Sequence, residues 1–504
     1  MEIEFREETI DFLQEKIVDG LYQEQTAEMT VPEELPAINR IVDCFGTVLV
    51  QSRSVSDGCV SVSGGIQAGV LYVPEGADGP ERIDVYIPFT VSKKMPTREN
   101  TTLFYWGWLK SIDARFINPR KVLVRANLGS ELSLFTPAQL ALKQVENCPA
   151  WLQCKERVCS MQLPVFAGEK EIQIADEVLM PEQEIGADRI LKWTCSAEVD
   201  ESSVVGDKAV FKGKLRIKAL YRSEDGRLAV WNGAVPYSQY LERGKHAEDG
   251  FVTVQPVFRT AELDTDGQID SRRLLLNMSV TAQVLVRGAI PVTLTEDVYC
   301  LGGEFEAQWQ ALDLKPCLDL VSQSCEQSLP IPEEAVKVLD WTVTEDQSAA
   351  AATAPQECAL RLSGSVMYYD KDETIRSKPL RLEKTVTVPD GENADWACVW
   401  RQTGPMTLAG RELKLPLRTD YVYYQKPGIK NLAGGVFTPV RRAEGPTLIV
   451  KKAEGELWEL AKQCGSTVEA LRQANGLEDD QIREQRLLLI PTGRAVYADG
   501  EDEA

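Results

Sequence analysis

Histidine is almost absent from this chain of 504 residues, which contains one, His246, inside the polar stretch Arg243-Gly244-Lys245-His246-Ala247-Glu248. Metal sites built on two histidines of one chain are therefore excluded. A histidine-based catalytic triad could use only this residue. Because polar neighbours surround it, we interpret His246 as a surface-loop residue.

Long apolar runs are also missing. No stretch approaches the ~18 apolar residues that a membrane-spanning helix requires. The first twenty residues, MEIEFREETIDFLQEKIVDG, carry acids where a secretion signal has a basic start followed by an apolar segment. We therefore expect a cytoplasmic protein without direct membrane insertion.

Positive charge is in short supply, with 55 Lys and Arg against 77 Asp and Glu, a formal net charge of −22. Such a surface repels phosphate backbones and anionic lipid headgroups, which argues against nucleic acid and membranes as partners. Partners should be neutral or carry basic patches. Residues 493–504 are predicted to form a solvated acidic tail.

The 12 cysteines are scattered and lack the dense spacing of a secreted disulfide framework. Cys148, Cys154 and Cys159 cluster, but no pair has the two-residue gap of a zinc knuckle or redox motif. We interpret them, together with Cys317 and Cys325, as buried or linker thiols. A redox or intermolecular crosslinking role is the alternative.

One acidic segment imitates a calcium-binding loop, Glu262-x-Asp264-x-Asp266-Gly267. Its twelfth position is Arg273, where such a loop requires a bidentate Glu, so a hairpin turn is the better interpretation. We accordingly predict no cofactor, no metal and no catalytic residue, and expect that the protein is not an enzyme.

The chain does contain an internal repeat. Each unit opens with an apolar residue followed by Pro-Glu, and a strand-like segment follows. The three openings are Val31-Pro32-Glu33 with Arg40-Ile41-Val42, Met180-Pro181-Glu182 with Arg189-Ile190-Leu191-Lys192-Trp193-Thr194, and Ile331-Pro332-Glu333 with Lys337-Val338-Leu339-Asp340-Trp341-Thr342.

Alternating segments ending in Tyr72, Tyr221 and Tyr368 follow the three openings. Alternation of apolar and polar residues with polar turns between the runs is typical of strands buried on one face. The Pro-Glu start suits a short helix before each sheet. We predict a mainly β protein of three tandem antiparallel β-sandwich-like modules with minor helices.

The predicted boundaries follow from the repeat. They are 1–136 for module 1 with an N-terminal helix, 137–165 for a partly helical linker broken at Pro149, 166–302 for module 2, 303–326 for a linker, 327–426 for a divergent module 3, 427–445 for a linker, 446–492 for a small terminal module, and 493–504 for the acidic tail.

These matching elements resemble the SPOCS domain, which is repeated in spore-coat-associated proteins of clostridia and their relatives. The resemblance covers roughly residues 25 to 425 and is clearest in the first two copies.

The terminal module reads as strand, helix, helix, strand. One apolar helix face is formed by Leu457, Leu460, Ala461 and Cys464 and stops at Gly465. Ser466-Thr467-Val468-Glu469 is predicted to be a capping box that opens the second helix, and Gly476 ends it. A βααβ unit of this length with Leu-Trp, Asn-Gly-Leu and a final Ile-Pro resembles a LysM module.

LysM modules usually bind N-acetylglucosamine chains in a groove between the loop after strand one and the loop after helix two. The resemblance places that partner- or glycan-binding groove at seven residues: Ala453, Glu454, Gly455, Glu456, Asn475, Leu477 and Ile482. The usual Gly-Asp-Thr is replaced by Glu454-Gly455-Glu456, and the added bulk and charge disfavour a neutral sugar. A protein ligand is therefore the preferred interpretation, and a glycan or a structural cap are alternatives.

Three SPOCS-like units followed by a LysM module resemble the SipL-like family of clostridial spore-envelope morphogenesis proteins. The resemblance implies a scaffold on the mother-cell side of the forespore surface, in the spore coat, that docks the SpoIVA-like coat morphogenetic ATPase or another spore-envelope protein. The rival hypothesis is a protein that anchors to peptidoglycan.

Overall fold

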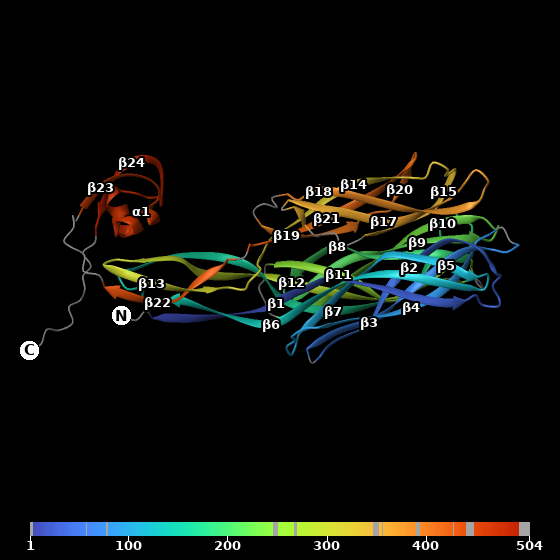
Figure 1. Cartoon of the computed structure of the whole chain (residues 1–504), viewed down its shortest axis with the longest axis horizontal. Helices are drawn as coiled ribbons and strands as arrows, with labels where there is room; N and C mark the ends of the chain where they lie inside the picture. Colours follow the sequence, from blue (N-terminus) through green and yellow to red (C-terminus); the bar gives the residue numbers. More distant parts are fainter. Residues whose placement is uncertain are drawn as a thin grey trace, which may run out of the picture.

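The computed structural model describes residues 4–56, 58–76, 79–244, 250–266, 270–345, 352–354, 356–389, 394–426, 428–439 and 448–492. Within these ranges strands dominate and the two helices both lie near the C-terminal end, so the mainly β prediction is confirmed (Figure 1). No helix in the described ranges has the length and hydropathy needed to cross a membrane. His246 and residues 493–504 lie outside them.

Module 1 is a sandwich of two antiparallel three-stranded sheets. One sheet has the order β2-β3-β4 and the other β1-β6-β5, and both contribute to a single apolar core. The strands are β1 (Phe5–Thr30), β2 (Ile38–Ser56), β3 (Cys59–Pro74), β4 (Glu81–Lys94), β5 (Thr102–Asn118) and β6 (Lys121–Val145).

Module 2 repeats this arrangement, with β8-β9-β10 facing β11-β12-β7. Its strands are β7 (Leu152–Leu179), β8 (Ala187–Val205), β9 (Lys208–Ser223), β10 (Leu228–Glu242), β11 (Gly250–Thr265) and β12 (Arg273–Cys300). The predicted sandwich architecture is thus present in both of the first two modules.

Module 3 has the same plan, with β15, β17 and β18 facing β14, β21 and β19. Its strands are β14 (Cys317–Pro330), β15 (Lys337–Glu345), β16 (Ala352–Ala354), β17 (Glu357–Tyr369), β18 (Ile375–Thr387), β19 (Asp395–Gln402), β20 (Thr407–Ala409) and β21 (Glu412–Tyr424). A single residue pair, Cys317 with Gln162, joins its β14 to β7 of module 2.

The Pro-Glu openings form turns and not the short helices that the sequence predicts. In module 1 the amide of Leu35 donates to the carbonyl of Pro32 over 3.1 Å, and Glu184 to Pro181 and Ala335 to Pro332 repeat this bond at 3.0 and 3.1 Å. One i to i+3 bond closes a single turn, and the chain then extends at once into β2, β8 or β15. Since these strands begin so soon, no room remains for a helix.

Equivalent strands of the three modules meet in the middle of the body. The first strand of each carries an equivalent irregularity, between Ile41 and Asp43, between Ile190 and Lys192, and between Val338 and Asp340. A β-bulge leaves one residue unpaired and redirects the strand. The skipped residues Val42, Leu191 and Leu339 meet in one apolar cluster with Leu71, Leu220 and Met367 of the neighbouring strands.

A stem extends from this three-module body, on the left in Figure 1. It consists of the far ends of β1, β6, β7 and β12 together with β13 (Gly303–Ala311) and β22 (Lys430–Pro439), which pair with each other. Its core contains Ile10, Leu142, Met161 and Val292. The fully buried Asn431 links β12 to β6, because its side chain accepts from the Thr295 amide and donates to the Lys143 carbonyl.

Four segments predicted as helix or linker are strands of the stem or lead into it. The N-terminal helix is instead part of β1, which pairs with β6 along nearly its whole length. Residues 137–165 are strand on both sides of a turn at Pro149, and 303–326 and the described part of 427–445 contribute β13, β14 and β22. Glu- and Lys-rich sequence has helical propensity, but pairing to neighbouring strands overrides a preference this weak.

Candidate functional site

The terminal module has the predicted strand-helix-helix-strand order: β23 (Leu448–Glu456), α1 (Leu457–Cys464), α2 (Val468–Asn475) and β24 (Gln481–Pro491). Gly465 and Gly476 end the helices in the left-handed conformation, with φ of 65° and 58°. The predicted capping box is one residue out of place. Thr467, not Ser466, caps α2 by accepting from the Ala470 amide at 3.0 Å, while the Ser466 hydroxyl donates to the Pro491 carbonyl.

The structure brings the two predicted groove loops together. Gly455 pairs with Ile482 and Glu456 with Gln481, so the first loop and the start of β24 run side by side. Glu454 is exposed, and Gly455 has a φ of +100° with open space where a Cβ would lie. A ligand can therefore reach the backbone at Gly455.

The three predicted groove residues on the other side, Asn475, Leu477 and Ile482, stabilise the fold of the module. Ile482 is 5% exposed and packs in the module's apolar core, which Leu477 and Ala453 cover in part. The Asn475 amide donates to the carbonyls of Leu471 and Leu489 and accepts from the Leu489 amide, at 2.9, 2.6 and 2.7 Å. Because these bonds occupy its side chain, Asn475 holds α2 against β24 and has little capacity left for a ligand.

Glu456 is bound by the stem. Its carboxylate accepts from the Lys155 ammonium of β7 at 2.7 Å, and both side chains remain about 40% exposed, at 44% and 37%. This hydrogen bond raises the pKa of Lys155. The first groove loop therefore lies beside a basic residue of the stem, a neighbour that an isolated module would not have.

The module docks on the stem through α1 and the end of β12. Figure 1 shows the module at the upper left, next to the end of the stem that contains β13 and β22. Asp297 accepts from the Trp458 indole at 2.8 Å and from the Lys462 ammonium at 2.6 Å. The Tyr299 ring packs edge-on against Trp458 with centroids 4.8 Å apart, and its hydroxyl donates to the Ser466 carbonyl at 2.9 Å. Burial raises the pKa of Asp297, but the hydrogen bonds from Lys462 and Trp458 outweigh it and lower the pKa overall.

Sequence reasoning missed this docking contact. Asp297 and Tyr299 lie near the end of a strand whose alternation resembles that of its neighbours, and no motif distinguishes them. The contact fixes the orientation of the terminal module relative to the stem.

The outer face of the two-stranded sheet is apolar and open. Leu448, Val450, Leu487 and Leu489 expose 51%, 60%, 71% and 41% of their surface. Val450 pairs with Leu489, so their side chains are neighbours on one face. Continuous apolar surface of this kind commonly marks a protein contact.

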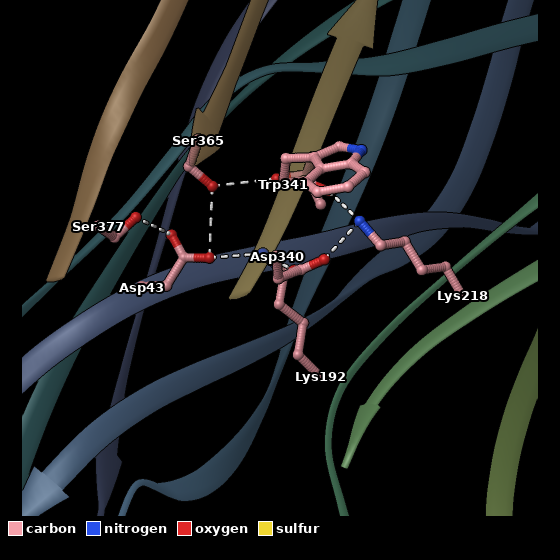
Figure 2. Close-up of polar contacts among 8 residues, drawn as sticks. Asp43, Lys192, Lys218, Asp340, Trp341, Ser365 and Ser377 are labelled. Carbon is pink, nitrogen blue, oxygen red and sulfur yellow. Dashed lines mark hydrogen bonds and ion pairs between the residues drawn. The ribbon is translucent and has the colours of Figure 1, made fainter. Parts of the chain in front are cut away.

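A second group of polar side chains converges where the three modules meet (Figure 2). The Lys192 ammonium lies 2.6 Å from the Asp43 carboxylate and 3.0 Å from that of Asp340, and the Lys218 ammonium lies 2.5 Å from Asp340. Ser365 and Ser377 donate to Asp43 at 3.3 and 3.2 Å. Two cations and two carboxylates balance in charge.

The arrangement of these charges between the modules favours assembly over chemistry. Asp43, Lys192 and Asp340 occupy the same repeat position in the three modules and are at most 7% exposed. Burial raises the pKa of Asp340, but Lys192 and Lys218 lower it overall, so the carboxylate stays charged. A cleft of ≈ 1600 Å³ opens beside the group. The sequence contained an indication of this group, because a charged residue interrupts the first apolar strand of each copy.

The acidic segment that resembles a calcium-binding loop does not form a metal site. Glu262 and Asp264 lie within β11 and not in the predicted hairpin turn, which follows the strand at Asp266, while Gly267 is outside the described residues. In the described part of the chain, no three His, Cys, Asp or Glu side chains gather as a metal site would require.

Of the three clustered cysteines, Cys148 and Cys154 are brought together, with sulfur atoms 3.7 Å apart, whereas the Cys159 thiol donates to the Val292 carbonyl.

Comparison with protein families matches the LysM domain to residues 449–491. Comparison with curated proteins found no match, and comparison with solved structures found none. The resemblance to SPOCS domains and to the SipL-like family has no support from these comparisons and stays a prediction. The chain therefore contains a LysM domain at residues 449–491, of the kind that binds N-acetylglucosamine polymers such as peptidoglycan.

Proposed function

We propose that this protein is a non-enzymatic scaffold of spore-envelope assembly, which presents its LysM domain on a rigid β body and docks a protein partner through it. The proposed partner is the SpoIVA-like coat morphogenetic ATPase or another spore-envelope protein. The proposed location is the cytoplasm on the mother-cell side of the forespore surface, in the spore coat.

The observation that carries this proposal is the apolar outer face of the LysM sheet. Leu448, Val450, Leu487 and Leu489 cover it, and the docking contact at Asp297 holds it in a fixed orientation. A preorganised face loses less freedom on binding than a tethered one.

Charge narrows the class of protein that fits. Lys452 lies two residues after Val450 on the same face, pairs with Leu487, and forms no ion pair with a side chain among the described residues. This exposed cation stands out on a chain with a net charge of −22. The matching surface is therefore apolar with an acidic group at its margin, because such a group pairs with Lys452.

Peptidoglycan anchoring is the second candidate, and the LysM match favours it. The open backbone at Gly455 is compatible with a sugar. Against it, the Asn475 amide is already bonded within the domain, and Glu454 and Glu456 place carboxylates where a neutral glycan needs close approach.

A two-arm binding experiment tests both. The full chain is incubated with purified peptidoglycan and, separately, with purified SpoIVA-like ATPase, and the bound fraction is measured. We expect retention by the ATPase that is lost in Val450→Glu/Leu487→Glu and kept in Val158→Glu, a change at a 74% exposed residue of the stem. Retention on peptidoglycan alone, abolished by removing residues 446–491, would reverse the ranking. Retention by neither ligand would reject both.

A further inference from the structure

The turn between β6 and β7 places two thiols in contact at the tip of the stem. Cys148 is exposed and Cys154 is half-buried, and their sulfur atoms are 3.7 Å apart. A disulfide has a sulfur–sulfur length of about 2.05 Å, so the two atoms need to approach by less than one van der Waals radius. No family match covers this turn, since the LysM domain begins at residue 449.

The backbone around the pair is held on both sides. Cys154 lies in β7 opposite Val298 of β12, and the Leu301 amide donates to the Trp151 carbonyl at 2.6 Å. The Trp151 ring stacks on Phe437 of β22 with centroids 4.2 Å apart. The two sulfurs therefore stay close because neighbouring strands fix the turn, and a chance encounter of mobile loops is not required.

The two thiols are chemically unequal. A hydrogen bond from Cys154 lowers the pKa of Cys148, against the opposing effects of burial and of Glu156. The same bond, with burial, raises the pKa of Cys154. Since an incoming disulfide reaches the exposed Cys148 before the half-buried Cys154, Cys148 is the sulfur that attacks first and Cys154 the one that follows.

We propose that Cys148 and Cys154 form a dithiol modification site that reacts with low-molecular-weight disulfides and closes to an intramolecular disulfide. The Cys148 thiolate attacks one sulfur of the incoming disulfide, which forms a mixed disulfide and releases one thiolate. The Cys154 thiol then loses its proton to solvent, and its sulfur attacks the Cys148 sulfur and releases the second thiolate. The two cysteines lose two electrons, and the incoming disulfide gains them to become two thiols.

The other contacting pair provides an internal control. The thiols of Cys358 and Cys398 are also hydrogen-bonded to each other, but both residues are buried in module 3. Contact without access is not expected to support the reaction. Selective reaction at Cys148 and Cys154 in the folded chain would show that exposure together with proximity defines the site.

The test uses the full folded chain and oxidised glutathione as the probe, with intact mass and peptide mapping as readouts. We expect the wild-type protein to lose two hydrogens, with Cys148 linked to Cys154 and with Cys358 and Cys398 still reduced. Cys154→Ser should keep one glutathione on Cys148, because no second thiol can displace it. Cys148→Ser should acquire neither the adduct nor the internal link.

Three results would overturn the proposal. They are a wild-type protein that keeps its glutathione adduct, disulfide-linked dimers through Cys148, and a reaction at Cys154 that persists in Cys148→Ser. An unchanged thermal unfolding curve for both serine variants confirms that loss of reaction does not reflect loss of fold.

Discussion

Replacing Lys192 with Met should destabilise the three-module body by about 3–5 kcal/mol, the usual cost of removing one partner from a buried ion pair. Lys192 is 2% exposed and is the cation closest to Asp43, at 2.6 Å. Without it, Asp43 keeps the hydroxyls of Ser365 and Ser377 but no cation within ion-pair distance among the described residues. Asp340 loses one of its two cations and keeps Lys218, 2.5 Å from its carboxylate.

Lys218→Met is the matched control. Lys218 is 19% exposed at its side chain, and its removal leaves Asp340 paired with Lys192. Lys218 also donates to the Trp341 carbonyl at 2.7 Å, and we expect a loss of about 1.5–3 kcal/mol, the range for a hydrogen bond to a charged group. In the background of Lys192→Met, Asp43→Asn should recover part of the loss, because an amide can bond to the two serines without carrying charge.

Urea unfolding followed by tryptophan fluorescence measures these differences. Three modules need not unfold together, so hydrogen exchange along β2, β8 and β15 should accompany it. Equal losses in Lys192→Met and Lys218→Met, or no recovery with Asp43→Asn, would refute the idea that the Lys192 charge holds the modules together.

The pH dependence has a defined sign. Since the folded pKa of Asp340 is lowered, its contribution to stability is present above the unfolded pKa, about 4, and is lost as the pH falls through the folded value. The difference in melting temperature between wild type and Lys192→Met should therefore narrow below about pH 4.

Three further changes test other parts of the molecule. Gly64→Ala and Gly213→Ala should each lower the free energy of urea unfolding by about 1–3 kcal/mol, because an added Cβ would lie 2.0 or 1.9 Å from a carbonyl oxygen of the adjacent strand. An alanine tolerated at either position would contradict the shared register. Asp297→Asn should weaken the docking of the LysM domain by about 1 kcal/mol. We expect faster limited proteolysis between the stem and residue 448, and an unchanged cleavage rate would contradict the prediction. Asn475→Ala should destabilise the LysM domain by about 1–3 kcal/mol, measured by hydrogen exchange of the Leu489 amide, and unaltered protection there would show that the bond contributes nothing.

Sequence patterns predicted the repeated modules well because each pattern reports local burial. Alternation before Tyr72 and Tyr221 marks one-sided strands, and both tyrosines are buried with their hydroxyls bonded to the equivalent carbonyls of Pro36 and Ile185. The LysM helices were also predictable, since Gly465 and Gly476 end them. These features depend on neighbours close in the chain.

The predictions that failed concern residues whose contacts lie far away in the chain. Residues 303–326 and 427–445 look like linkers in the sequence, the second because it is rich in Gly and Pro, and the pairing of β13 with β22 and of β14 with β21 makes part of them strand. Asn475 matches a groove position, yet its bonds to Leu489 make it structural. The grouping of Asp43 with Lys192 and Asp340 requires knowing that the first strands of the three copies meet.

The length of β7 and β12 has a mechanical consequence. Each strand has 28 residues and runs from the body to the end of the stem that carries the LysM domain. Tension between that domain and the body acts along these strands, so the hydrogen bonds of their ladder are sheared together and not unzipped one after another. A stem built in this way resists pulling along its long axis far better than it resists peeling from the side.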